Sequence, residues 1–182
     1  ANGVSLDGDL TIADNFALNA GVFDINTAKL TLNQPIATTG IFGPALMVQT
    51  GGNPTDGGLE FLFDADETIT YPFGVAGSYT PLIADIDTTN NDAGYIGVNP
   101  VASKLGTLND DVAVVDFLNY YWSVENREFT DLPRINSYVF SYRDNAADDD
   151  VTGTEGDLQP GFVEDGVDGD NDGDSFSRVA VG

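Results

Sequence analysis

Apolar and polar residues alternate in short segments along residues 1–40. The alternation is clearest in Asp9–Ile12, Gly21–Ile25 and Lys29–Leu32, and Asp, Asn and Gly separate these segments. A period of two is typical of β-strands, because successive side chains point to opposite faces of a sheet. The residues between the segments are those that form turns. The pattern therefore predicts a series of short strands.

Two arrangements of these short strands fit the pattern. In the first, they are rungs of a right-handed β-solenoid, in which each turn brings the chain back to stack on the preceding rung. In the second, they form a β-meander within one sheet of a sandwich. A few rungs are not stable alone, so the solenoid arrangement also needs the remainder of the chain.

Longer strand candidates follow a turn-rich segment at residues 41–58, which itself contains a candidate at Ala45–Thr50. The later candidates are rich in β-branched and aromatic residues, and Gly, Pro, Asn or Asp separate them. They are residues 59–63, 68–73, 79–86, 95–98, 111–122 and 136–143. This spacing is typical of a β-sandwich, and no segment keeps a helical period for three turns.

The predicted fold class is therefore all-β, with an antiparallel, loop-rich and calcium-stabilised β-sandwich whose N-terminal strands form either solenoid-like rungs or a meander. The turn-rich segment marks a soft boundary. It divides the chain into N-terminal rungs or a meander at residues 1–40 and a sandwich at residues 41–182. The alternative is a single continuous domain.

The chain is strongly acidic, and this limits the classes of partner that it can bind. It has 30 acidic residues against six basic ones, and its formal net charge is -24. Nucleic-acid binding requires clustered Lys and Arg that neutralise phosphates, so no nucleic-acid partner is expected. No apolar run approaches the length of about 20 residues that spans a bilayer, so no membrane insertion is expected either.

The residue types available for catalysis are few. Without His or Cys, the chain cannot build a Ser-His-Asp or Cys-His relay or a His-based zinc centre. A pair of carboxylates could in principle hydrolyse a glycoside, but acidic residues are so numerous that such a pair arises by chance. The sequence predicts that the protein is not an enzyme.

An aspartate run near the C-terminus carries the clearest chemistry. Carboxylates occupy alternate positions, and Ca²⁺ takes six to eight oxygen ligands from such loops. Counted from Asp168, the run follows the start of an EF-hand loop, but Val179 stands where a bidentate Glu belongs. We therefore expect a calcium loop of another kind, closed by Glu164 or Asp165; the alternative is a solvated acidic linker. The predicted ligands are Glu164, Asp165, Asp168, Asp170, Asp172 and Asp174, with Asp144, Asp148 and Asp150 as a secondary site.

Three aromatic residues, Tyr120, Tyr121 and Trp122, are consecutive. Along a strand, Tyr120 and Trp122 point to one face and Tyr121 to the other. Exposed, the first pair could stack on a sugar ring; buried, it belongs to the core, which is the usual role of large aromatic residues. Trp122 and Tyr120 are thus the candidate ligand-binding residues, with surface glycans as the partner.

Several short sequence motifs resemble those of a known class of proteins. They are Tyr71–Val75, Gly77–Leu82, Tyr120–Val124 and the Leu-Thr-Ile and Leu-Thr-Leu segments of residues 1–40. Together they are similar to repetitive ectodomains of secreted Bacteroidota surface proteins, the class exported by the type IX system. The resemblance covers about residues 1 to 145. It implies an extracellular β-module and carries no active-site residue onto this chain.

These observations predict an extracellular, cell-surface module with a structural or adhesive function, ordered by Ca²⁺. One alternative is a filament subunit that joins copies of itself by strand exchange through its termini, at Val4–Ile12 or Ser177–Val181. Another is a carbohydrate-binding module. The expected partners are neighbouring modules, copies of the chain, or surface glycans.

Overall fold

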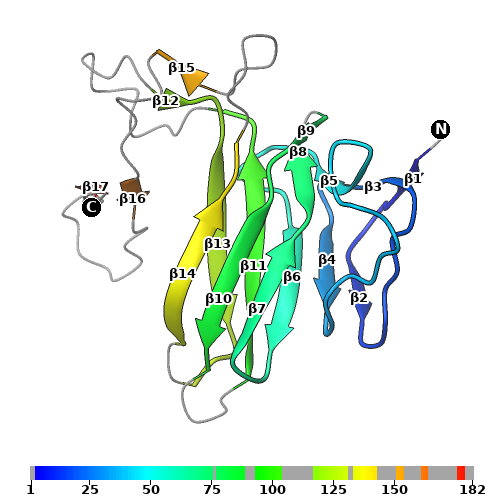
Figure 1. Cartoon of the computed structure of the whole chain (residues 1–182), viewed down its shortest axis with the longest axis horizontal. Coiled ribbons are helices and arrows are strands. Elements are labelled where there is room, and N and C mark those ends of the chain that lie inside the picture. The colour runs from blue at the N-terminus through cyan, green and yellow to red at the C-terminus, as the bar shows by residue number, and fades with distance from the viewer. Residues whose placement is uncertain are drawn as a thin grey trace.

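The computed structural model describes residues 3–75, 77–88, 93–103, 117–130, 133–142, 151–153, 161–163 and 176–178. These residues form strands joined by turns and loops (Figure 1), which confirms the all-β class. Within these ranges, no helix is long and apolar enough to cross a membrane.

The N-terminal part is a stack of parallel strands on two sides. On one side, β1, β3, β5 and β8 pair in parallel, and β9 adds antiparallel to β8. On the other side, β2, β4 and β6 pair in parallel. The chain visits the two sides alternately, as a solenoid does. The strands are β1 Val4–Ser5, β2 Leu10–Ile12, β3 Gly21–Asn26, β4 Lys29–Leu32, β5 Leu46–Thr50, β6 Gly58–Phe63, β8 Phe73–Val75 and β9 Ser78–Tyr79.

This parallel pairing decides between the two predicted arrangements. A meander pairs successive strands antiparallel, so the meander is wrong and the rungs are solenoid-like. The rung is longer than the sequence pattern suggested, however. Leu10 of β2 pairs with Leu30 of β4, whereas Gly21–Asn26 lies in the opposite sheet and does not stack on β2. One rung therefore contains two strands.

An antiparallel sandwich continues directly from the rungs. Strand β6 pairs with β11, which pairs with β13, so one five-stranded sheet has the order β13-β11-β6-β4-β2. The facing sheet has the order β14-β10-β7, and only Pro72 separates β7 from β8. The strands are β7 Glu67–Tyr71, β10 Leu82–Asp87, β11 Gly94–Val101, β13 Tyr121–Arg127 and β14 Arg134–Phe140; shorter pairs are β12 Phe117–Leu118 with β15 Val151–Thr152, and β16 Gly161–Val163 with β17 Phe176–Arg178.

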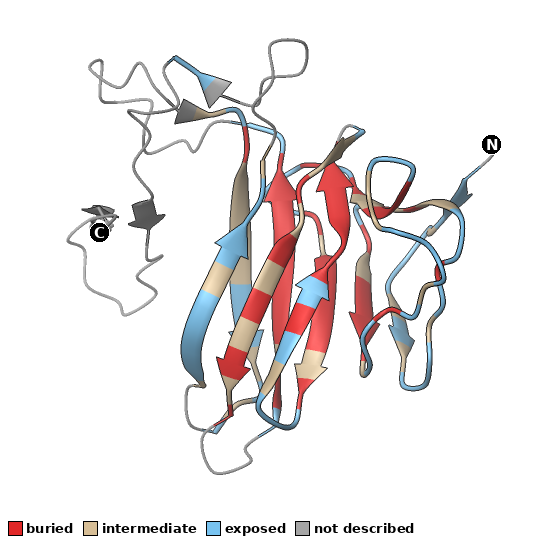
Figure 2. Cartoon of the chain, viewed as in Figure 1, coloured by how far each residue is buried: buried red, intermediate tan, exposed pale blue. Residues whose placement is uncertain are grey.

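One hydrophobic core runs through the rungs and the sandwich. Buried residues extend from β11 and β6 to β4 (Figure 2), and Leu30, Phe61 and Tyr71 are each fully buried in it. The Tyr71 ring packs edge-on against Phe61 with 4.9 Å between centroids, and its hydroxyl donates to the Ile96 carbonyl at 2.7 Å. Burial raises the pKa of Tyr71 well above its usual value, so the hydroxyl stays a donor that links the two sheets.

Most predicted strands are present in the structure. Those at 9–12, 21–25, 29–32, 45–50, 59–63 and 95–98 match β2, β3, β4, β5, β6 and β11 to within a few residues. The candidate at 79–86 is divided into β9 and β10, and that at 68–73 into β7 and the start of β8. Pairing of β3 with β5 and of β4 with β6 crosses the predicted boundary at residue 40. Residues on both sides of that position thus share two sheets.

Candidate functional site

The predicted calcium ligands lie outside the described residues. This holds for Glu164, Asp165, Asp168, Asp170, Asp172 and Asp174, and also for Asp144, Asp148 and Asp150. Within the part of the chain that the structure describes, no three acidic side chains are grouped closely enough to hold a metal ion. The calcium site stays a prediction from the sequence.

The two candidate glycan-binding rings lie at one edge of the sandwich. Tyr120 is buried, whereas Trp122 is half-buried and packs against the core. Their rings are in T-shaped contact at 5.0 Å, and the Trp122 ring also contacts Phe140 of β14 at 4.7 Å. The Trp122 indole donates to the Thr80 carbonyl at 3.1 Å. These contacts fix the indole between β13 and β14, and glycan binding by this pair stays a prediction.

A buried carboxylate organises the outer face of the five-stranded sheet. Glu60 of β6 has only 3% of its side chain exposed, and Arg127 of β13 donates to both of its oxygens at 2.6 and 2.9 Å. Thr31 donates a third hydrogen bond at 2.9 Å, and the Lys29 ammonium lies 3.7 Å away. Burial raises the pKa of Glu60, but the hydrogen bonds and the two cations lower it more, and the net pKa is lowered. The charged form is therefore well accommodated.

This network ties three strands together. Lys29 and Thr31 belong to β4, Glu60 to β6 and Arg127 to β13. The Arg127 guanidinium also stacks over the Tyr95 ring of β11 at 3.8 Å, within the range of a cation–π contact. With this contact, side chains join β4, β6, β11 and β13 on the outer face of the sheet, in addition to their packing in the core.

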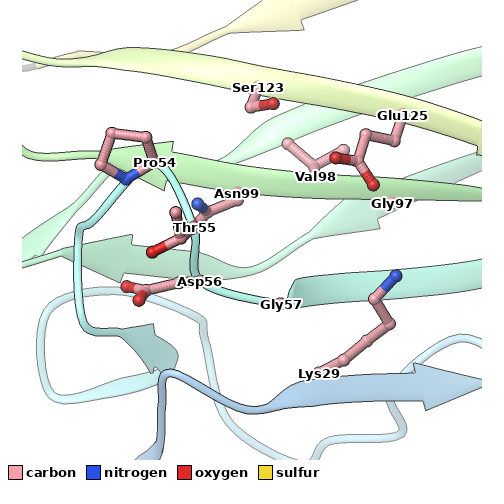
Figure 3. Close-up of a pocket in the computed structure, with 10 residues that line it drawn as sticks. All are labelled: Lys29, Pro54, Thr55, Asp56, Gly57, Gly97, Val98, Asn99, Ser123 and Glu125. Atoms are coloured by element: carbon pink, nitrogen blue, oxygen red, sulfur yellow. The ribbon is translucent and has the colours of Figure 1, made fainter.

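A shallow polar depression of about 230 Å³ lies beside the network (Figure 3). Its lining includes Lys29, Asp56 and Glu125, and the loop before β6 forms one wall. Asn99 is 5% exposed and donates to the Asn53 carbonyl of that loop at 2.8 Å. The depression is smaller than the roughly 300–1,000 Å³ of typical ligand pockets. We interpret it as a gap between the sheet and the loop that packs against it.

The first rung forms an open end of the stack. Strands β1 and β2 are the edge strands of their sheets. Four apolar residues of this rung, Leu6, Leu10, Ile12 and Phe16, are half-buried, whereas Val4 is exposed and Leu18 is buried. The corresponding residues of the second rung, Ile25, Leu30, Leu32 and Ile36, are buried. The interior of the stack is therefore partly exposed at this end, which lies beside the N-terminus in Figure 1.

Backbone groups also point outward at the open end. The Leu6 amide donates to Asp24 at 2.9 Å, and the Ile12 carbonyl accepts from Asn33 at 3.1 Å, so both residues face the second rung. Backbone groups of successive strand residues point to opposite sides. The amide and carbonyl groups of Ser5 and Thr11 therefore point away from the second rung, toward the open side, as at any sheet edge.

Sequence reasoning missed the Glu60 network and the full length of the rung. The rung had a signal, because Leu10-Thr11-Ile12 recurs as Leu30-Thr31-Leu32, and Ala17 recurs as Ala37 at the same spacing. The network had none: Glu60 and Arg127 are 67 residues apart, and only the pairing of β6, β11 and β13 brings them together.

Comparison of the chain with protein-family models, curated proteins and solved structures finds no significant match.

Proposed function

We propose that this chain is an extracellular structural or adhesive β-module of a secreted or cell-surface protein, ordered by Ca²⁺. Its task is to extend or stiffen a longer assembly and to join a neighbour. The same conclusion agrees with the resemblance of its short phrases to Bacteroidota surface ectodomains.

The observation that carries the proposal is the asymmetric stack. At one end the rungs continue into a sandwich through a shared core, and at the other end the half-buried Leu10, Ile12 and Phe16 form an open face. In repeat proteins each rung contacts only its neighbours, so the stack lengthens by adding further rungs. The first rung therefore fits contact with a further rung, as in a module of a longer assembly.

The acidity of the chain supports the calcium part of the proposal. A net charge of -24 destabilises a compact body through self-repulsion. Carboxylate-rich loops bind Ca²⁺ from extracellular media at millimolar levels. A bound divalent ion offsets part of this charge and orders the loop that holds it.

Calcium is expected to raise the melting temperature. Saturation at about 100 times the Kd adds about 2.7 kcal/mol to the folded state, which corresponds to a rise in Tm of roughly 5–10 °C for a chain of this size. The measurement is calorimetry in CaCl₂ and in EDTA at matched ionic strength. Asp170→Asn with Asp172→Asn should abolish the increment, whereas the exposed Asp7→Asn should keep it. An equal Tm in CaCl₂ and EDTA would contradict the metal site.

The open end also favours a second candidate, a filament subunit in which the neighbour is another copy of the chain. Thr11→Pro tests it, because Pro removes an amide that points to the open side and leaves the bonds from Leu10 and Ile12 to β4. We expect the wild type to associate with rising concentration in sedimentation velocity. The variant should stay monomeric, with a far-ultraviolet spectrum like that of the parent. Equal association of both proteins would count against strand addition at this edge.

A further inference from the structure

We infer that the depression beside the Glu60 network binds a single sugar ring through the hydroxyl groups of the ring. This inference rests on the adhesive part of the proposed function, because it names the class of surface ligand that the module recognises. The site differs from the candidate pair Tyr120 and Trp122. It lies on the outer face of the five-stranded sheet, whereas the Trp122 ring packs against the core.

A glycine leaves room at the floor of the depression. Gly97 lies inside β11, opposite Glu60 of β6 and Glu125 of β13. A Cβ atom added there would meet only the Glu60 side chain, at 3.6 and 3.8 Å, and Gly97 has no positive φ. Neither the backbone nor a close contact therefore requires glycine. A glycine inside a strand often marks a place where a ligand approaches closely, and Gly97 is among the residues that line the depression (Figure 3).

A buried acceptor beside Gly97 lacks a partner. Asn99 lies two residues further along β11, so both residues are on the outer face of the sheet. The Asn99 Nδ2 donates to the Asn53 carbonyl at 2.8 Å, and this bond fixes the orientation of the amide. Its Oδ1 is buried and has no hydrogen-bond partner among the described residues. An unpaired buried acceptor costs free energy, and a ligand hydroxyl that donates to this atom removes the cost.

Charges of both signs surround the same space. The Lys29 ammonium is 3.7 Å from Glu60, which is longer than a hydrogen bond, so its N–H groups can donate to a ligand oxygen. Glu125 is exposed and offers two acceptor oxygens, and Figure 3 shows Gly97 between these two side chains. A small cation would meet the Lys29 ammonium, and a small anion would meet the carboxylates of Glu125 and Asp56. A neutral ligand with groups that both donate and accept avoids both repulsions, and adjacent sugar hydroxyls have this property.

The size of the depression limits the ligand to one ring. Its volume of about 230 Å³ is below the roughly 300–1,000 Å³ that larger ligands fill. None of the described residues that line it is aromatic, so the binding energy comes from hydrogen bonds alone. We therefore expect a Kd in the millimolar range. Several modules that engage one glycan surface together would raise the overall affinity.

The test is an NMR titration of the isotope-labelled chain with methyl α-D-mannopyranoside, methyl β-D-galactopyranoside and N-acetylglucosamine. At least one sugar should bind and shift the side-chain amide signal of Asn99. Gly97→Val should weaken binding by about tenfold or more, because its side chain takes the space of the ring. Glu125→Ala changes an exposed residue and should weaken binding by about fivefold or more, because a charged acceptor is lost. Asn126→Ala is the matched control: Asn126 is also exposed but points to the other side of β13, and this variant should bind like the parent.

The inference is overturned if none of the three sugars shifts the Asn99 signal, or if Gly97→Val and Glu125→Ala bind as tightly as the parent. A shift of this signal by CaCl₂ or sodium sulfate, with none by the sugars, would assign the depression to an ion instead. Binding that is lost in Trp122→Phe and kept in Gly97→Val would place the sugar at the aromatic pair. These outcomes are separate from a failure of the proposed function, because the calcium increment and the self-association are measured without sugar.

Discussion

Leu30→Ala is expected to lower the free energy of unfolding of the whole molecule by about 3 kcal/mol, within the roughly 2–5 kcal/mol found when a buried Leu is truncated. Leu30 is fully buried and lies in the ladder between Leu10 and Leu59. Its methyl groups face a core that both sheets share. The substitution leaves a cavity in a close-packed interior, and the surrounding strands relax into it only in part.

The decisive measurement is urea unfolding followed by two probes. Trp122 is the single tryptophan and lies in β13, in the sandwich, whereas the far-ultraviolet signal reports all strands. A continuous core predicts that both probes shift together in Leu30→Ala. Ile41→Ala is the control: Ile41 is 93% exposed, and its truncation should change stability by less than about 0.5 kcal/mol. A Trp122 transition that Leu30→Ala leaves in place would show that the rungs unfold separately.

Arg127→Met should destabilise the protein by about 2 kcal/mol at neutral pH, because it removes one partner of a buried charge. It leaves the Glu60 carboxylate buried, with Thr31 and the Lys29 ammonium at 3.7 Å as its remaining partners. Breaking a fully buried pair costs about 3–5 kcal/mol. The Arg127 side chain is 38% exposed, so solvent screening reduces the figure. Chemical denaturation measures the loss, and Arg134→Met, at an exposed position of β14, is the matched control.

The loss should also depend on pH. Because the pKa of Glu60 is lower in the folded chain than its ordinary value, the network stabilises above the unfolded pKa of about 4.3 and loses this contribution as pH falls through the folded pKa. In Arg127→Met, burial acts with fewer opposing partners, and the pKa of Glu60 rises. The stability difference between parent and variant should therefore shrink as pH falls from about 5 to 3.

A double-variant cycle separates the ion pair from packing. If Arg127 acts through the Glu60 charge, then Glu60→Gln with Arg127→Met should cost less than the sum of the two single changes. Additive losses, or an Arg127→Met loss equal to that of Arg134→Met, would contradict the assigned role of the network.

The positions of the strands could be predicted from the sequence because their signal is local. Alternation in Lys29–Leu32 and the β-branched and aromatic residues of Leu59–Phe63 mark strands without reference to their partners. The direction of pairing is not local. Leu30 pairs with Leu10 on one side and with Leu59 on the other. The second separation along the chain is longer than the first, because residues 33–45 before β5 and residues 51–57 before β6 both form longer connections than their counterparts in the first repeat. This difference hides the repeat.

The features of the candidate site also differ in whether the sequence alone predicts them. The aspartate run Asp168 to Asp174 is contiguous, so its chemistry can be proposed from residue order alone. The open rung cannot be predicted in this way, because Leu10 and Leu30 are the same residue type in the same local sequence pattern. Only the structure shows that Leu10 is half-buried and Leu30 is fully buried.

The sequence by itself thus determined that this protein is an acidic, all-β chain of short strands with a carboxylate run suited to Ca²⁺, because alternation, turn residues and charge are properties of neighbouring residues. Only the tertiary structure decided that the strands stack in parallel, that Glu60 is buried between two cations, and that Ser5 and Thr11 face an open edge. Those features depend on which distant segments meet. Burial of the shared core decides which of these segments pair.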